Sequence, residues 1–98
     1  VERYKNVRAI NSTGTRALSV TITSINAATR QPIAHVELEI IGQGIRRVSS
    51  NRGYNTVANL IAGNHKIEAM HPNYKPKTVD FTVVTGETTE LLLELEAV

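Results

Sequence analysis

The three histidines are the first side chains to consider, because histidine binds zinc and serves in acid–base catalysis. His65 and His71 lie six residues apart. On one extended strand, which rises about 3.3 Å per residue, this spacing separates them by roughly 20 Å, so they cannot share a metal ion. His35 and Glu37 could form only a two-ligand surface site, and a solvated strand face is the favoured interpretation. We therefore expect no metal site.

Paired carboxylates are the second candidate for chemistry. Glu37/Glu39 and Glu94/Glu96 each have a spacing of two, which places each pair on one face of a strand. Glycosidase chemistry also needs a cleft and one carboxyl group in an apolar environment, so solvated faces are favoured here as well. The chain has one aspartate, Asp80, and we expect no calcium site because calcium requires a cluster of oxygen ligands.

Sequence signatures of nucleophilic and cofactor chemistry are absent. The chain has no cysteine, no Gly-x-Ser-x-Gly, no P-loop and no Gly-x-Gly-x-x-Gly. Gly42-Gln43-Gly44 precedes a strand pattern and predicts a hairpin turn. The sequence thus predicts no catalytic residue, no cofactor and no enzymatic activity, although an enzyme with a histidine-based site is kept as a third hypothesis.

A few aromatic and basic residues are candidates for ligand binding. Tyr54 and Tyr74 lie near predicted loops and could stack on a sugar, although the absence of tryptophan counts against this. Arg46 and Arg52 could belong to a basic rim for an anionic partner, with Arg47, Lys75 and Lys77. A scattered solvated surface is the favoured alternative.

The charge distribution argues against nucleic-acid binding by the domain. The chain has a formal net charge of +2 and a pI of about 9.2. Residues 1–17 hold four of the eleven basic residues and one of the nine acidic residues, so residues 18–98 carry a net charge of −1. A domain without a basic face, and with four aromatic residues in the whole chain, lacks a surface for phosphates or stacked bases.

From Leu18 onward, apolar residues recur at every second position. Seven short segments of this kind alternate with turn signals, which predicts an all-β, seven-stranded antiparallel Greek-key sandwich. A closed barrel is the alternative, because periodicity does not determine strand order. Gly53 and Gly63 are expected to take positive φ in turns. The predicted buried residues are Val36, Leu38, Val57, Ile67, Phe81 and Leu93.

Residues 1–17 form a separate segment in this interpretation, and the domain comprises residues 18–98. Val1, Tyr4, Val7 and Ile10 recur every three residues, which indicates a short helical lead-in, and residues 11–15 break the pattern. This lead-in is either the end of an upstream element or an apolar stripe that docks on the sandwich. A chain that begins at Val1 is expected to be a fragment of a longer protein, and we expect no membrane insertion by this segment.

Four stretches carry a resemblance to a known family. Thr29–Val36, Ser49–Gly53, Asn59–His65 and His71–Lys75 resemble the turn motifs of the carboxypeptidase regulatory-like domain, over residues 18–96. The resemblance implies a transthyretin-like, or prealbumin-like, sandwich. The chain departs from the family at several positions: Arg30, His35 and Asn73 replace glycine, Ser50 replaces aspartate, Asn55 replaces an inward aromatic residue, and His65 replaces tyrosine.

The functional expectation follows from the resemblance and from the missing reaction centre. Domains of this family serve as non-catalytic accessory modules in secreted metallocarboxypeptidases and in bacterial cell-surface or outer-membrane proteins. The resemblance therefore implies an exported protein and a role as spacer, folding support or docking domain for a neighbouring domain or another protein. The alternative is a module that binds carbohydrate or another ligand.

Overall fold

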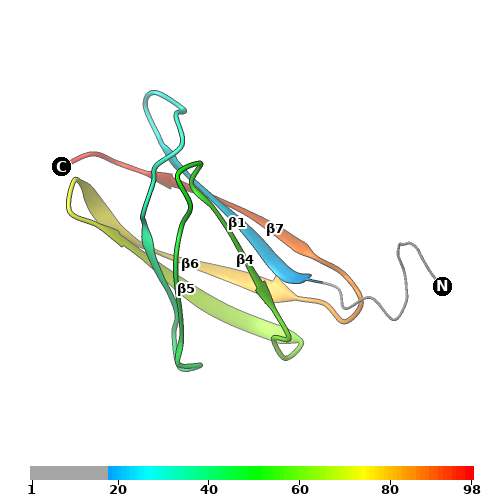
Figure 1. Ribbon diagram of the computed structural model, residues 1–98. Coiled ribbons are helices and arrows are strands. Elements are labelled where there is room, and N and C mark those ends of the chain that lie inside the picture. Colours follow the sequence, from blue (N-terminus) through cyan, green and yellow to red (C-terminus); the bar gives the residue numbers. More distant parts are fainter. Residues whose placement is uncertain (1–17) are drawn as a thin grey trace.

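A computed structural model describes residues 18–98 of the chain (Figure 1). The predicted helical lead-in and the boundary of the linker over residues 1–17 lie outside the described residues. The described part contains seven strands: β1 (Leu18–Asn26), β2 (Glu37–Ile40), β3 (Ile45–Val48), β4 (Tyr54–Ala58), β5 (Gly63–His71), β6 (Tyr74–Val83) and β7 (Thr89–Leu95). Within residues 18–98, no helix is long or apolar enough to span a membrane.

The strands form two sheets, which confirms the prediction of an all-β sandwich of seven strands. One sheet has the order β3-β2-β5-β6, and the other has the order β4-β1-β7. The sheets lie face to face, with β5 and β6 in one layer and β1, β4 and β7 in the other (Figure 1). A closed barrel is therefore not the arrangement of the described chain.

One strand pair differs from the expected antiparallel arrangement. β1 and β7 pair in parallel, with Val20 opposite Thr89 and Asn26 opposite Leu95. All other strand pairs are antiparallel. Parallel neighbours need a long connection, and here the five intervening strands provide it. As a result, the described chain enters β1 at one end of the sandwich and leaves β7 at the other (Figure 1).

The core lies between the sheets and is built by the alternation read from the sequence. All six residues predicted to be buried are at most 6% exposed, so this prediction is confirmed. Their neighbours in the core come from both sheets: Val20, Ile22, Ile33, Ile40, Ala69, Val83 and Leu95. The expected positive φ is also confirmed at Gly53 (73°) and Gly63 (129°).

β6 begins earlier than the sequence predicts. The apolar alternation of Val79, Phe81 and Val83 indicates only its second half, whereas the strand begins at Tyr74 and includes Pro76. β6 is an edge strand of its sheet, so the missing N–H group of Pro76 need not break a ladder hydrogen bond. Because proline argues against a strand, the sequence does not indicate the first half of β6.

Asn55 shows how the chain accommodates a polar residue where the related family has an aromatic one. Its side chain is half-buried, its Nδ2 donates to the Val48 carbonyl oxygen at 2.8 Å, and its Oδ1 accepts from the Thr56 N–H at 2.8 Å. The bond to Val48 joins β4 to β3, which are edge strands of different sheets. Both polar ends of the amide are thus satisfied.

Candidate functional site

The four residues singled out for ligand binding do not come together in one site. Arg46 lies on the outer face of the four-stranded sheet, where it forms an ion pair with Glu39 at 3.6 Å. Tyr54 is 46% exposed and belongs to β4 of the other sheet. Arg52 is exposed in the turn between β3 and β4. Arg46 and Tyr54 therefore present their side chains to opposite sides of the sandwich.

Tyr74 has a structural role. It is half-buried against the core, and its hydroxyl oxygen accepts a hydrogen bond from Asn26 Nδ2 at 3.2 Å. Its ring meets His71 edge-on, with a centroid distance of 5.2 Å. These contacts join the start of β6 to the end of β1. The sequence could not reveal them, because Asn26 is 48 residues away.

Two of the three histidines are held by local contacts, whereas His35 is exposed just before β2. His65 and His71 lie on β5, as predicted. His65 Nε2 is 2.6 Å from the Ile61 carbonyl oxygen, and its ring stacks on Phe81. His71 Nδ1 accepts from the N–H of Asn73 at 3.1 Å. Within residues 18–98, no group of three or more histidine, aspartate or glutamate side chains could hold a metal ion.

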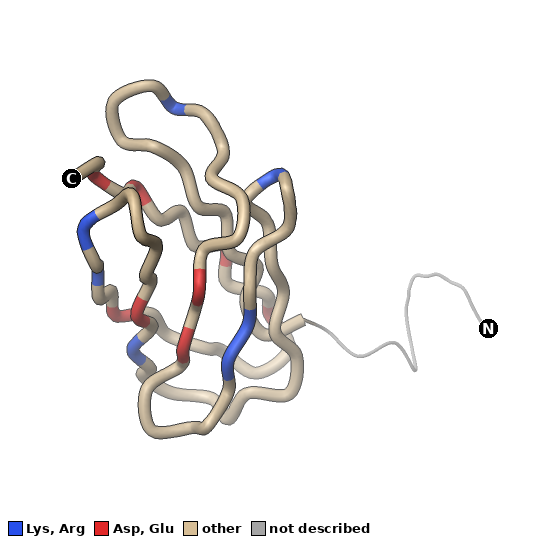
Figure 2. Tube along the Cα trace, turned by 60° about the vertical axis from the view of Figure 1, so that its left-hand side comes forward, with Lys and Arg blue, Asp and Glu red and all other residues tan. Residues whose placement is uncertain are grey.

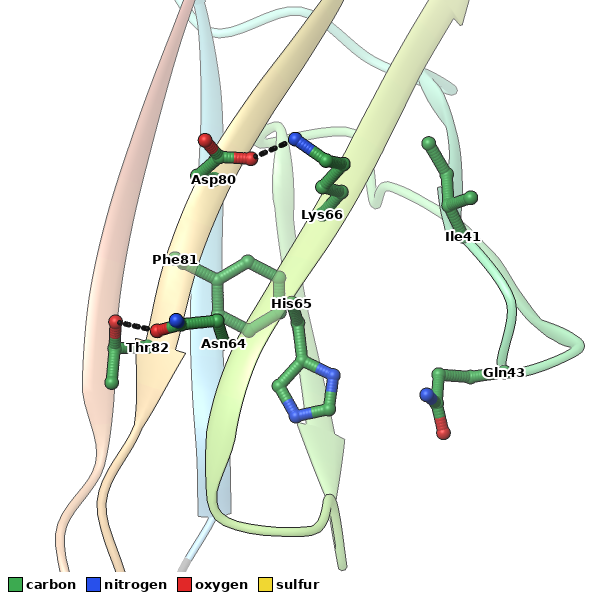
Figure 3. Close-up of a pocket in the computed structure, with 8 residues that line it drawn as sticks. All are labelled: Ile41, Gln43, Asn64, His65, Lys66, Asp80, Phe81 and Thr82. Carbon is green, nitrogen blue, oxygen red and sulfur yellow. Dashed lines mark hydrogen bonds and ion pairs between the residues drawn. The ribbon is translucent and has the colours of Figure 1, made fainter.

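Two hollows lie on the outer side of the four-stranded sheet. Figure 3 shows the first, which has a volume of about 540 Å³ and lies between the ends of β5 and β6 and the turn with Ile41 and Gln43. Lys66 Nζ pairs with Asp80 at 2.7 Å across this part of the sheet. Thr82 Oγ1 bonds to Asn64 Oδ1 at 2.9 Å. Most polar side chains around this hollow thus already have partners within it.

The second hollow lies over the middle of the same sheet face and has a volume of about 480 Å³. We define the acidic–apolar face as the six outward residues around it: Glu37, Glu39, Glu68, Arg46, Val48 and Met70. Their strands are neighbours in the order β3-β2-β5, so the alternation of each strand brings them to one surface. In Figure 2 the acidic positions of β2 lie beside basic positions of β3.

Charge and exposed apolar area are combined on the acidic–apolar face. Glu39 lies opposite Arg46 on one side and opposite Glu68 on the other, so its carboxylate has one arginine and one further carboxylate as cross-strand neighbours. Like charges directly opposite each other on a sheet are destabilising. Glu37 lies between Val48 and Met70, which are 57% and 43% exposed. A partner that covered this face would bury apolar area and could supply positive charge.

The sequence reasoning missed this face, although a signal was present. Val48 and Met70 are apolar residues at outward positions, out of phase with the buried residues of their strands. On β5 the side chains of Ile67 and Ala69 face the core. Met70 directly follows Ala69, so its side chain faces outward. The alternation therefore predicts that Val48 and Met70 face outward. It does not predict which residues lie beside them, because this depends on the order of the strands in the sheet.

Comparison with known proteins gives a likeness of fold. No family model matches the chain, and no curated protein matches it. Among solved structures, the TIE protein of Bacillus anthracis aligns with a TM-score of 0.68 at 19% identity, over 83% of this chain and 17% of that one. The major pilin subunit BcpA of Bacillus cereus aligns with a TM-score of 0.64 at 15% identity, over 86% of this chain and 31% of that one.

A third similar structure is an enzyme. The 5-hydroxyisourate hydrolase of Klebsiella pneumoniae aligns with a TM-score of 0.58 at 16% identity, over 80% of this chain and 85% of that one. The described chain is thus a β-sandwich domain of transthyretin-like fold. This chain spans less than a third of the length of each of the first two proteins. The likeness at these identities shows the fold alone.

Proposed function

We propose that this domain is a non-catalytic accessory module of a larger exported or cell-surface protein. Its role is to space and dock the neighbouring domain on its N-terminal side. The observation that carries the proposal is the acidic–apolar face, where Val48 and Met70 are exposed around three glutamates. The likeness to a pilin subunit, which is a part of an assembled structure, supports a role in association between domains.

The charge of the chain indicates which neighbour the face would receive. Residues 1–17 precede β1 directly and carry four basic residues against one acidic residue. The hollow at the acidic–apolar face is lined by three glutamates and two arginines, and one of these arginines, Arg46, is already paired with Glu39. Opposite charges on two surfaces guide their association and set its orientation. The upstream part of the chain is therefore the occupant that this face fits.

Amide spectra of the native protein test this proposal. The 98-residue chain is compared by heteronuclear NMR with a variant in which Arg3, Lys5, Arg8 and Arg16 are replaced by serine, so that the basic charge of residues 1–17 is lost. We expect changes in the amide signals of Glu37, Val48 and Met70, because docking would cover them. Thr21 and Thr56, on the outer face of the other sheet, serve as the internal control. Unchanged signals on the acidic–apolar face would reject docking there.

A second candidate function rests on the outer face of the three-stranded sheet. Tyr54 lies opposite Thr23 on β1, and Leu92 of β7 lies on the other side of Thr23. A hollow of about 460 Å³ surrounds them, so an exposed aromatic ring stands beside hydroxyl groups, as in many sugar sites. Titration with a glycan panel should then shift the Tyr54 amide signal in a saturable manner. No saturable shift would exclude carbohydrate binding at this face.

A further inference from the structure

The parallel pairing of β1 with β7 determines how tension on the chain would act on the fold. Residues 20–26 of β1 pair one to one with residues 89–95 of β7. The chain enters at Leu18, beside the start of β7, and leaves at Leu95, beside Asn26 at the far end of β1 (Figure 1). We propose that the β1–β7 pair is a mechanical clamp, which keeps the domain folded when the protein is pulled from both sides. This inference rests on the proposed role as a spacer.

The direction of the load follows from this geometry. A pull toward the N-terminus draws β1 toward its own start, and a pull toward the C-terminus draws β7 toward its own end. Because the strands are parallel, these two forces slide them past each other. The hydrogen bonds between the strands run across the direction of sliding, so the whole ladder is strained at once. Opening a hairpin from its end breaks such bonds one after another.

Contacts at both ends of the pair reinforce the clamp. At the entry, Thr88 Oγ1 donates to the Leu18 carbonyl oxygen at 2.7 Å. At the exit, the N–H of Ala27 donates to the Leu95 carbonyl oxygen at 2.8 Å. Beside the exit, Arg30 and Glu94 form an ion pair at 2.9 Å between the β1–β2 connection and β7. Both ends of the β1–β7 ladder are thus closed, and beyond the exit Glu96 and Val98 also form backbone hydrogen bonds with Lys75 and Asn73.

The strands of the clamp are also anchored to the rest of the domain. Leu93 and Leu95 of β7 are fully buried, as are Val20 and Ile22 of β1. On the outer edge of β7, Lys77 Nζ of β6 donates to the Glu94 carbonyl oxygen at 3.0 Å. These contacts oppose the peeling of either strand from the sandwich, so we expect unfolding under end-to-end load to require the two strands to slide.

Single-molecule force measurements test the clamp. The 98-residue chain is placed between reference domains and pulled through its two ends. It is compared with an N64C/T82C variant, pulled through the two introduced thiols, which are the only thiols because the native chain has no cysteine. Asn64 and Thr82 lie opposite each other on β5 and β6, so this second geometry opens one hairpin from its end. We expect an unfolding force at least about twofold higher in the end-to-end geometry.

Two threonine variants test whether the resistance to end-to-end force comes from the β1–β7 pair. Thr88→Val removes the hydroxyl bond between the β7 side and β1, whereas Thr82→Val removes a hydroxyl bond within β5 and β6. The first variant should lower the end-to-end force more than the second, after allowance for any change in the equilibrium free energy of unfolding. Equal forces in the two pulling geometries, or an equal effect of the two variants, would overturn the clamp. The amide spectra test docking separately, so the two proposals can fail independently.

Discussion

Gly53 is packed against the backbone of two other segments. Its φ is 73°, and a Cβ atom at this position would overlap the Ser24 carbonyl oxygen and lie 3.1 Å from the Ile33 nitrogen. The same glycine accepts a hydrogen bond from the Ser24 N–H at 2.8 Å through its own carbonyl oxygen. The turn between β3 and β4 is thus fixed to β1 by close contact, which only glycine permits.

We expect Gly53→Ala to lower the free energy of unfolding by about 2 to 5 kcal/mol, from left-handed strain and overpacking together. Gly42→Ala is the matched control, because Gly42 has a φ of 81° and open space around its Cβ position. That substitution should cost about 1 to 2 kcal/mol from strain alone. Urea unfolding measures both. Equal losses would show that backbone contact at Gly53 is unimportant.

Arg30 and His35 occupy left-handed positions where the family that the chain resembles has glycine. Their φ angles are 66° and 60°. Such a conformation costs a residue with a Cβ atom roughly 1 to 2 kcal/mol, against a smaller entropic cost for glycine. His35→Gly should therefore raise the free energy of unfolding by about 0.5 to 1 kcal/mol. Arg30 is a less suitable site, because its ion pair with Glu94 would be lost as well.

Asn59→Gly is the control for this prediction, since Asn59 also has a positive φ, of 64°. Asparagine tolerates the left-handed region better than histidine does, so the gain there should be smaller. Thermal and urea denaturation of the three chains compare the effects. A loss of stability in His35→Gly would mean that the imidazole makes a contact worth more than the strain.

At the scale of the elements, the sequence predicts the strands but not their partners. The alternation of Val36, Leu38 and Ile40 is a local property, so six predicted core residues and seven strands could be found without a structure. The parallel β1–β7 pair could not, because pairing depends on contacts about 70 residues apart. Local alternation indicates only the second half of β6, because the first half contains Pro76 and lacks the apolar pattern.

Some features of the candidate site can likewise be predicted from the local sequence, whereas others depend on the strand order. The exposure of Arg46 and Tyr54 follows from their own strands. The acidic–apolar face needs the order β3-β2-β5, which brings Val48 and Met70 to either side of Glu37. The role of Tyr74 depends on Asn26 at the end of β1. Local patterns therefore predict which residues face outward, whereas the topology decides which of them form a site.

Phe81 is the residue of β6 that tests whether the inward-facing positions of this strand are assigned correctly. It is 6% exposed, belongs to the core and stacks on His65 with a centroid distance of 5.5 Å. Phe81→Ala should lower the free energy of unfolding by about 3 to 5 kcal/mol, because it leaves a cavity between the sheets. Phe81→Leu keeps most of the volume and should cost less than about 1.5 kcal/mol. A loss under about 1 kcal/mol for the alanine variant, measured in urea, would contradict the assignment.

At the scale of the whole molecule, the two parts of the chain differ in charge. Residues 18–98 carry a net charge of −1, whereas residues 1–17 carry +3. Four of the seven basic residues in residues 18–98 form ion pairs: Arg30 with Glu94, Arg46 with Glu39, Lys66 with Asp80 and Lys75 with Glu96. The high pI therefore describes the first segment and not the folded domain.

This difference makes a prediction about nucleic acid. At about 50 mM salt the native chain should bind duplex DNA weakly through Arg3, Lys5, Arg8 and Arg16, and the binding should fall steeply at about 200 mM because phosphate contacts release counterions. Replacement of these four residues by serine should abolish the binding at both salt concentrations, while the far-ultraviolet circular dichroism stays unchanged. Fluorescence anisotropy of a labelled duplex measures the affinities. Binding that survived the four replacements would locate a basic surface on the sandwich itself, and it would also weaken the proposed match between residues 1–17 and the acidic–apolar face.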